Sequence, residues 1–305
     1  KLINHENIPI YIFCSFLYYK DYQVAKRFYS EILGFENVFE IERFSTIFQT
    51  SPTTFITIVS DDGTGRAMHS ADEPKTVAIA LITDHVSEWY DYAMQQNLNI
   101  RAPLKPLGDR TYQSFFVTDP GGYILEFEYL ARHPQNKKLI PLLDASAHIY
   151  PKPDIKTSRP ANLGIKASIY WLYHEDRAKT ADFYQNVMGL DMLVEQAFAD
   201  IYTSSRTGYI GLVTSGKGSS IFATPKKAVN IGFITRNAQN WLDFFKTDSR
   251  AVLRETVLSP DLYKNGVPLR NVVVAYDPEN YYIEIDEFLN VEANKTILET
   301  LDQNK

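Results

Sequence analysis

The stretch LGFENVFE, residues 33–40, decides how this chain is interpreted, because a similar phrase, MGLD, returns at residues 188–191. In the first stretch Leu33 closes an apolar helical pattern, Gly34 ends it, and Phe35 begins a run typical of a β-strand. Glycine is common just past a helix, since it adopts the left-handed conformation there at no steric cost. The recurrence indicates that the chain uses one structural unit twice.

Three pairs of segments match in the same order along the chain. Within each pair the same residues keep the same spacing: Leu-Tyr, Asp, Phe-Tyr and Gly in the first, Ile-Thr, Trp and Asp in the second, and Asp-Pro and Glu in the third. The offsets are about 155, 152 and 158 residues, and small loop insertions explain the drift. Ordered matches of this kind predict an internal duplication. The pairs are 17–36 with 172–191, 82–91 with 234–243, and 119–126 with 277–284.

Each copy contains the same succession of predicted elements. A β-like run (8–18, 163–173) is followed by an aspartate suited to cap a helix, Asp21 or Asp176, and by a helix that ends near Leu33 or Met188. A second helix begins near Asp84 or Asn237, and a hairpin closes each copy. These alternating elements predict an α+β fold. The remaining strand candidates are 43–50, 53–59 and 76–82, with partners at 198–203, 208–214 and 229–235.

Between and after the copies the composition changes. Residues 131–162 are rich in proline, which fixes φ and removes amide donors, so we expect an extended linker there. Residues 290–305 are mostly polar and are predicted to form a tail with a short helix. The predicted organisation is therefore a first module at 1–130, the linker at 131–162, a second module at 163–289, and the tail at 290–305.

Composition excludes several classes of protein. The chain has 305 residues and a net charge of −6, without a basic stripe, so we expect no nucleic-acid partner. No apolar stretch approaches the roughly 20 residues of a membrane helix, so we expect no membrane partner. Cys14 is the only cysteine, which excludes an intramolecular disulfide.

The chain begins with Lys1, so we expect that an N-terminal piece was removed. A cytoplasmic location is favoured, and a secreted or periplasmic one stays open.

Two phrases resemble the vicinal oxygen chelate superfamily, which includes glyoxalase I, bleomycin-resistance proteins and extradiol dioxygenases. Residues 28–36 resemble its helix-one phrase. Residues 119–126 resemble its closing hairpin, usually written DPxGNxxE, and residues 277–284 are a weaker version. The resemblance implies two tandem βαβββ modules, whose curved sheets pair into a cup around a site. It also implies a divalent metal (Mn, Fe, Ni or Zn), held by His, Gln or Glu on first strands and by Glu on last strands.

Only part of that ligand set is present. Glu126 and Glu284 match the last-strand glutamate, and strand alternation separates each of them from its apolar neighbours. The alternative is that these acidic faces simply meet solvent. The first-strand positions hold Cys14 and Ile169, or Ser168 after a shift of one residue, and none of the six histidines lies within a predicted strand. Cys14 is either a thiolate ligand or a small core residue. The metal site is predicted to be degenerate, so any divalent metal is held by Glu126 and Glu284, and otherwise no cofactor is expected.

Other residues are candidates for binding or catalysis. His174, beside two acids, is a candidate general base, or else an exposed loop residue. Arg110 and Tyr112 are candidates to anchor an anionic ligand, or else they lie on an exposed strand face. Tyr170 and Tyr173 are candidates to stack on a planar ligand, or else they pack in the core.

Two functional hypotheses follow. In the first, the protein is a glyoxalase- or dioxygenase-like lyase, isomerase or oxygenase that acts on a small oxygenated molecule, aromatic or not, in the cup. Glu126 or Glu284 then serves as metal ligand or base. In the second, it is a non-catalytic, metal-free cup that binds or sequesters a small molecule, as bleomycin-resistance proteins do. Whether it is an enzyme stays open at this stage, and the chain is expected to be a monomer or a homodimer.

Overall fold

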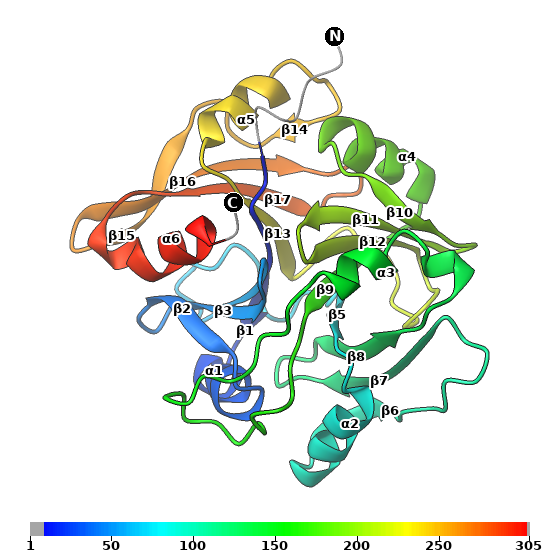
Figure 1. Ribbon diagram of the computed structural model, residues 1–305. Helices are drawn as coiled ribbons and strands as arrows, with labels where there is room; N and C mark the ends of the chain where they lie inside the picture. The colour runs from blue at the N-terminus through cyan, green and yellow to red at the C-terminus, as the bar shows by residue number, and fades with distance from the viewer. Residues whose placement is uncertain (1–8, 304–305) are drawn as a thin grey trace.

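The computed structural model describes residues 9–303 and contains two large mixed β-sheets with helices packed against them (Figure 1). Lys1 and residue 8, the first of the predicted strand 8–18, lie outside the described residues. The α+β class and the pair of curved sheets are confirmed. None of the helices within residues 9–303 is long and apolar enough to span a membrane.

The nine-stranded sheet combines strands from both ends of the chain. Its order is β14 (Val252–Leu253), β16 (Val267–Tyr276), β17 (Tyr282–Phe288), β13 (Val229–Ile234), β1 (Ile12–Tyr19), β4 (Thr54–Ser60), β3 (Ser45–Ser51) and β2 (Glu36–Ile41), with β15 (Ser259–Lys264) paired to β16.

The eight-stranded sheet combines strands from the middle of the chain. Its order is β10 (Met192–Glu195), β11 (Ala199–Ser205), β12 (Gly208–Thr214), β9 (Ala167–His174), β5 (Val77–Ile82), β8 (Ile124–Leu130), β7 (Tyr112–Thr118) and β6 (Asn99–Ala102).

The strand order shows that each predicted copy contains two βαβββ units, so the chain has four. The first unit joins the fourth where β1 pairs antiparallel with β13, and Cys14 lies opposite Gly232. The second joins the third where β5 pairs antiparallel with β9, and Ile79 lies opposite Tyr170. In Figure 1 the dark-blue strand β1 accordingly lies beside β13, far from it in sequence. Each sheet is therefore shared between the two copies. The division at 130, 162 and 289 stays a prediction.

The helices begin and end as the sequence indicates. They are α1 (Tyr22–Arg27) with the π-helical turn η2 (Phe28–Ile32), α2 (Val86–Gln95), α4 (Arg177–Asp182) with the turn η4 (Phe183–Val187), and α5 (Ala238–Phe245). The Asp21 carboxylate accepts from the Val24 N–H at 3.0 Å, and Asp176 accepts from Lys179 at 3.1 Å, as predicted for helix caps. Gly34 and Gly189 have φ of 62° and 71°, the left-handed conformation expected after each helix.

The linker and the tail contain equivalent structures. Each has a 3₁₀ turn followed by a helix: η3 (Pro134–Asn136) and α3 (Ile140–Asp144) in the linker, and η5 (Glu292–Asn294) and α6 (Lys295–Asp302) in the tail. Asn136 donates through its side chain to the carbonyls of Thr111 and Ala131, at 2.8 and 2.9 Å. Asn294 donates to those of Leu269 and Leu289, at 2.6 and 2.8 Å. The duplication thus extends beyond residues 130 and 289, and the linker is only partly extended.

Candidate ligand-binding cups

Each sheet has one face packed on helices and an opposite face that lines a cavity. On β1, alternation directs Phe13, Leu17 and Tyr19 into the core shared with the helices. It directs Phe16 and Tyr18 into a cavity of about 560 Å³, which we call cup A. The equivalent face of the eight-stranded sheet lines a cavity of about 200 Å³, which we call cup B. Helix α6 packs on the face that forms cup A, and α3 packs on the face that forms cup B.

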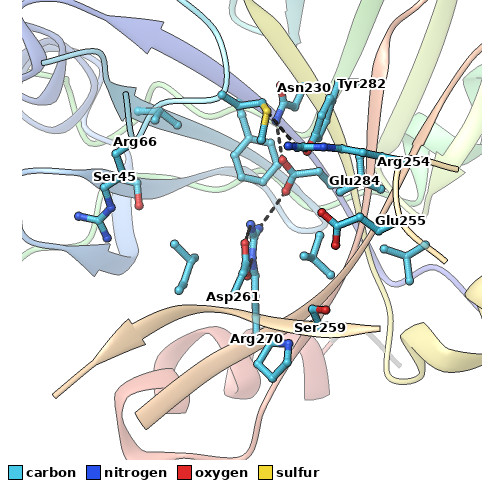
Figure 2. A pocket seen from close by; sticks show the side chains of 18 of the residues that line it. Ser45, Arg66, Asn230, Arg254, Glu255, Ser259, Asp261, Arg270, Tyr282 and Glu284 are labelled. Carbon is cyan, nitrogen blue, oxygen red and sulfur yellow. Dashed lines mark hydrogen bonds and ion pairs between the residues drawn. The ribbon is translucent and has the colours of Figure 1, made fainter. Parts of the chain in front are cut away.

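A buried arginine dominates the charges of cup A (Figure 2). The Arg270 guanidinium lies 3.1 Å from Glu284 and 2.9 Å from Asp286, both on the neighbouring strand β17. Its Nε also donates to Asp261 on β15, at 2.7 Å. Burial raises the pKa of Glu284 and Asp286, while the Arg270 charge acts in the opposite direction. The acids of cup A thus have a cation supplied by the chain itself.

The donors of cup A do not fit a divalent metal. Glu284, the predicted ligand, accepts from the Asn230 amide and pairs with Arg270, so its oxygens are already engaged. The Cys14 thiol is buried, and burial raises its pKa, which disfavours the thiolate that a metal would need. Packing against Gly232 is tight here, because a Cβ on that glycine would lie 2.5 Å from the Cys14 sulfur. Cys14 is therefore the small core residue of the two alternatives.

Cup B contains a pair of acids without such a cation. Glu126 and Glu128 are 5% and 3% exposed, and both line the cavity beside Tyr173 and Trp171. The predicted alternation of β8 is correct, since Leu125 and Phe127 pack on the opposite face. The solvent-facing interpretation of these acids is wrong, because both side chains are buried. Burial raises the pKa of Glu126 to about 7. It also raises the pKa of Glu128 well above its ordinary value, with the Glu126 charge as the second cause.

Across residues 9–303, no group of three or more His, Cys, Asp or Glu side chains is arranged to hold a metal ion. Cup B offers two carboxylates, and cup A offers carboxylates already bound to arginine. The family's divalent site is therefore not supported by the donors present in either cup.

The other candidates lie in different places. Tyr112 and Tyr173 line cup B, whereas Arg110 is exposed in the loop before β7 and does not line it. Tyr170 faces the opposite side of the sheet, where its hydroxyl donates to the Phe55 carbonyl and its ring packs 4.6 Å from Phe13. Tyr170 is thus a core residue, and only Tyr112 and Tyr173 are placed to meet a ligand.

His174 is fully buried rather than exposed in a loop. Its Nε2 lies 3.0 Å from Asp277, and it lines neither cup. In the first copy the equivalent residue is Tyr19, which donates to Asp119. Both aspartates begin the Asp-Pro turns and accept two backbone N–H groups within them. His174 therefore holds a turn in place, which explains why the Asp-Pro phrase recurs.

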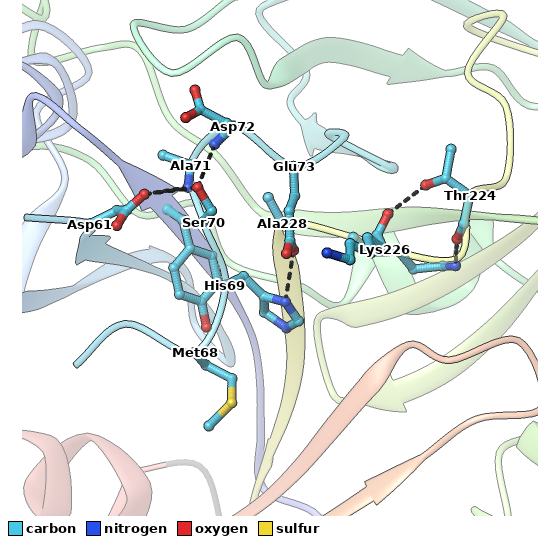
Figure 3. A network of polar contacts seen from close by, with 12 residues as sticks. Asp61, Met68, His69, Ser70, Ala71, Asp72, Glu73, Thr224, Lys226 and Ala228 are labelled. Carbon is cyan, nitrogen blue, oxygen red and sulfur yellow. Dashed lines mark hydrogen bonds and ion pairs between the residues drawn. The ribbon is translucent and has the colours of Figure 1, made fainter. Parts of the chain in front are cut away.

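The sequence did not indicate Arg270 in cup A, nor His69, which packs against two of the tyrosines that line the cup. Arg270 carries no motif of its own, although the hairpin register places it on the same face as Glu284 and Asp286. His69 comes from the loop between β4 and β5, where no periodicity marks it. Figure 3 shows its ring paired with Glu73, with Nδ1 at 3.0 Å, and the ring also packs edge-on against Tyr18 and Tyr282.

Comparisons with known proteins agree with this fold. Residues 10–127 match the model of the Glyoxalase/Bleomycin resistance protein/Dioxygenase superfamily. Glyoxalase I from Zea mays is similar over 98% of both chains, with 13% identity and a TM-score of 0.62. A point variant of that enzyme gives 0.65 at 12% identity over 97% of this chain and 98% of that one. A putative dioxygenase from Bacillus subtilis gives 0.58 at 16% identity, over 92% of this chain and 84% of that one.

No curated protein sequence matches the chain. Residues 10–127 are thus similar to the glyoxalase, bleomycin resistance and dioxygenase superfamily, and the whole chain has the fold of these solved structures.

Proposed function

We propose that this protein binds a small oxygenated or aromatic molecule in cup A and does so without a divalent metal. The observation that carries this proposal is the Arg270 cluster, in which a guanidinium takes the place beside Glu284 that a metal would need. This corresponds to the metal-free hypothesis from the sequence. Because both cups are completed within one chain, we also propose that the protein functions as a monomer.

The walls of cup A suit a planar ligand with polar substituents. Phe16, Tyr18 and Tyr282 supply aromatic surface, and Arg254 donates to the Tyr282 hydroxyl at 2.8 Å, near the cavity. Aromatic walls with a few fixed polar groups are typical of small-molecule pockets, and a volume of about 560 Å³ is ordinary for one. The ligand therefore stacks on the aromatic rings while its oxygens face the polar side chains.

The test is to screen catechols and aromatic carboxylates by quenching of intrinsic fluorescence, with metal content measured in the same preparations. Val274 lines cup A, and the equivalent position in cup B holds Phe116. Val274→Phe should fill cup A and abolish binding. Val213→Phe, on the wall of cup B, is the matched control and should leave binding unchanged. Stoichiometric Mn, Fe, Ni or Zn that is lost in Glu284→Gln would refute the metal-free proposal.

One observation favours a second function, acid–base catalysis in cup B. A carboxyl group with a pKa of about 7, as burial gives Glu126, is suited to accept a proton near neutral pH. The enzymatic hypothesis would then rely on Glu126 as base and on no metal. Turnover of a small α-hydroxycarbonyl compound that disappears in Glu126→Gln, with a pH profile rising through about 7, would support it. Equal turnover in Glu126→Gln and wild type would exclude it.

A further inference from the structure

The two cups are equivalent by duplication, and one pair of equivalent positions on their closing hairpins differs in charge. Arg270 precedes Asp277 by seven residues, and Tyr112 precedes Asp119 by the same number. The hairpin registers agree, since Arg270 lies opposite Phe288 and Tyr112 lies opposite Leu130, the equivalent residue. Where cup A has a guanidinium, cup B has a phenol.

The acids nevertheless remain in cup B. Glu126 and Glu128 correspond to Glu284 and Asp286, and among residues 9–303 no Lys, Arg or His lines the cavity. Neither carboxylate forms an ion pair with any residue between 9 and 303. Glu128 is 3% exposed, lines the cavity, and leaves its Oε2 without a hydrogen-bond partner in this part of the chain. A buried carboxylate oxygen without a donor is costly, so a partner from outside the chain would stabilise it.

We propose that cup B binds a small organic cation, an ammonium or guanidinium, whose charge lies beside Glu126 and Glu128 as that of Arg270 lies beside Glu284 and Asp286. The aromatic surroundings agree with this assignment. In cup A the Arg270 guanidinium carbon lies 5.6 Å from the centre of the Phe16 ring. The equivalent residue in cup B is Trp171, which lines the cavity with Tyr173 and offers a stronger cation–π surface.

An organic cation fits better than a metal ion. Two carboxylates leave a divalent ion without the imidazole or third acid that it needs, and none stands nearby in residues 9–303. The remaining walls are apolar or aromatic, including Phe116, Ala199 and Val213, and they match methyl or methylene groups. A cavity of about 200 Å³ limits the ligand to a small molecule.

Binding should depend on pH in a defined direction. Tyr112 and Tyr173 face the acids with raised pKa values and stay neutral, while Arg110 and Arg101 act on these two tyrosines from outside the cavity. Only the deprotonated carboxylates attract a cation. Since burial raises the pKa of Glu126 to about 7, and also raises that of Glu128, affinity should fall as pH drops from 8 to 6.

The experiment is calorimetric titration of the full chain with guanidinium, methylammonium and tetramethylammonium, and separately with Mn²⁺. At pH 8 we expect wild type to bind at least one organic cation. Glu128→Gln should weaken binding by about tenfold or more, since it removes a buried charge partner. Tyr112→Arg, which supplies the cation found in cup A, should abolish binding without lowering the melting temperature. Val274→Phe, which fills cup A, is the control and should bind as wild type does.

Three results would overturn the assignment to cup B. The first is no binding of any of the three organic cations at millimolar concentration. The second is equal affinity in wild type, Glu128→Gln and Tyr112→Arg, which would place the binding elsewhere. The third is tight binding of Mn²⁺ alone, which would make the acids a metal site. Failure of cup A to bind a ligand would leave this assignment untouched.

Discussion

Arg270 shows how one side chain determines the chemistry of a cavity. It brings three acids together around one guanidinium. Taking these charges out of water costs free energy, which the ion pairs offset only while the arginine is present. Removing the cation alone therefore leaves buried charges uncompensated.

We predict that Arg270→Met lowers the free energy of unfolding by about 3–5 kcal/mol at pH 7. The loss should shrink toward pH 5. Without the cation, burial holds the pKa of Glu284 and Asp286 even further above the values these groups have in the unfolded chain. A carboxyl group with a raised pKa in the folded state destabilises the fold progressively as pH rises above its unfolded pKa. At lower pH both groups are protonated and this penalty disappears. Urea unfolding at both pH values measures the difference.

Arg250 offers a matched control, because it also pairs with two aspartates, Asp182 and Asp248, but on the surface. Arg250→Met should cost less than about 1 kcal/mol, since exposed ion pairs contribute little. Equal losses in the two variants would contradict the account of Arg270.

The role of His174 can be tested by substituting this one residue. If it serves only to hold the Asp277 turn, then tyrosine, its counterpart in the first copy, should replace it. His174→Ala is expected to cost about 2 kcal/mol or more, because it leaves a cavity and a buried carboxylate short of a donor. His174→Tyr should cost less than half of that by thermal unfolding. A tyrosine variant as unstable as the alanine variant would argue against the equivalence.

Among the elements, the two 3₁₀ turns with their asparagines are the least expected finding. Asn136 and Asn294 each satisfy two carbonyls at the end of a closing hairpin. We predict that Asn136→Ala and Asn294→Ala each lower stability by about 1–3 kcal/mol, because buried acceptors lose their donors. Chemical denaturation should give similar values for the two. A loss in only one of them would show that the turns are not equivalent.

The ends of helices were predictable from the sequence, because they depend on neighbouring residues. The pairing of strands that are distant in sequence was not predictable. Caps at Asp21 and Asp176 and left-handed Gly34 and Gly189 depend on a few neighbouring residues, so composition and spacing identify them. The pairing of β1 with β13 depends on residues more than 200 positions apart and leaves no mark on either strand. A search for repeats finds the copies but does not determine which copy supplies each sheet.

The candidate site follows the same division. Period-2 alternation separated Glu126 and Glu284 from their apolar neighbours, and both line cavities; the hairpin register would have added Arg270. Burial of His174 was not predictable, because its partner Asp277 lies 103 residues away. His69 reaches the rings of Tyr18 and Tyr282 through the path of a loop, which no periodicity describes.

For the whole molecule, the shared sheets predict that the halves hold together without a covalent link. A protease site placed at residues 153–154, in the exposed part of the linker, should allow cleavage into two fragments. The fragments should elute together in gel filtration, because the β1–β13 and β5–β9 pairings join them. Urea should separate them. Spontaneous separation in native buffer would contradict the shared sheets.

Because each cup takes one unit from each half, the chain behaves like a dimer whose two subunits have been fused. In a symmetric dimer every substitution appears in both cavities at once, so the cavities cannot diverge. Fusion gives each wall position two independent codons, and Arg270 and Tyr112 show the outcome at one of them. One pocket was able to neutralise itself while its twin kept its acids free, a specialisation that symmetry forbids.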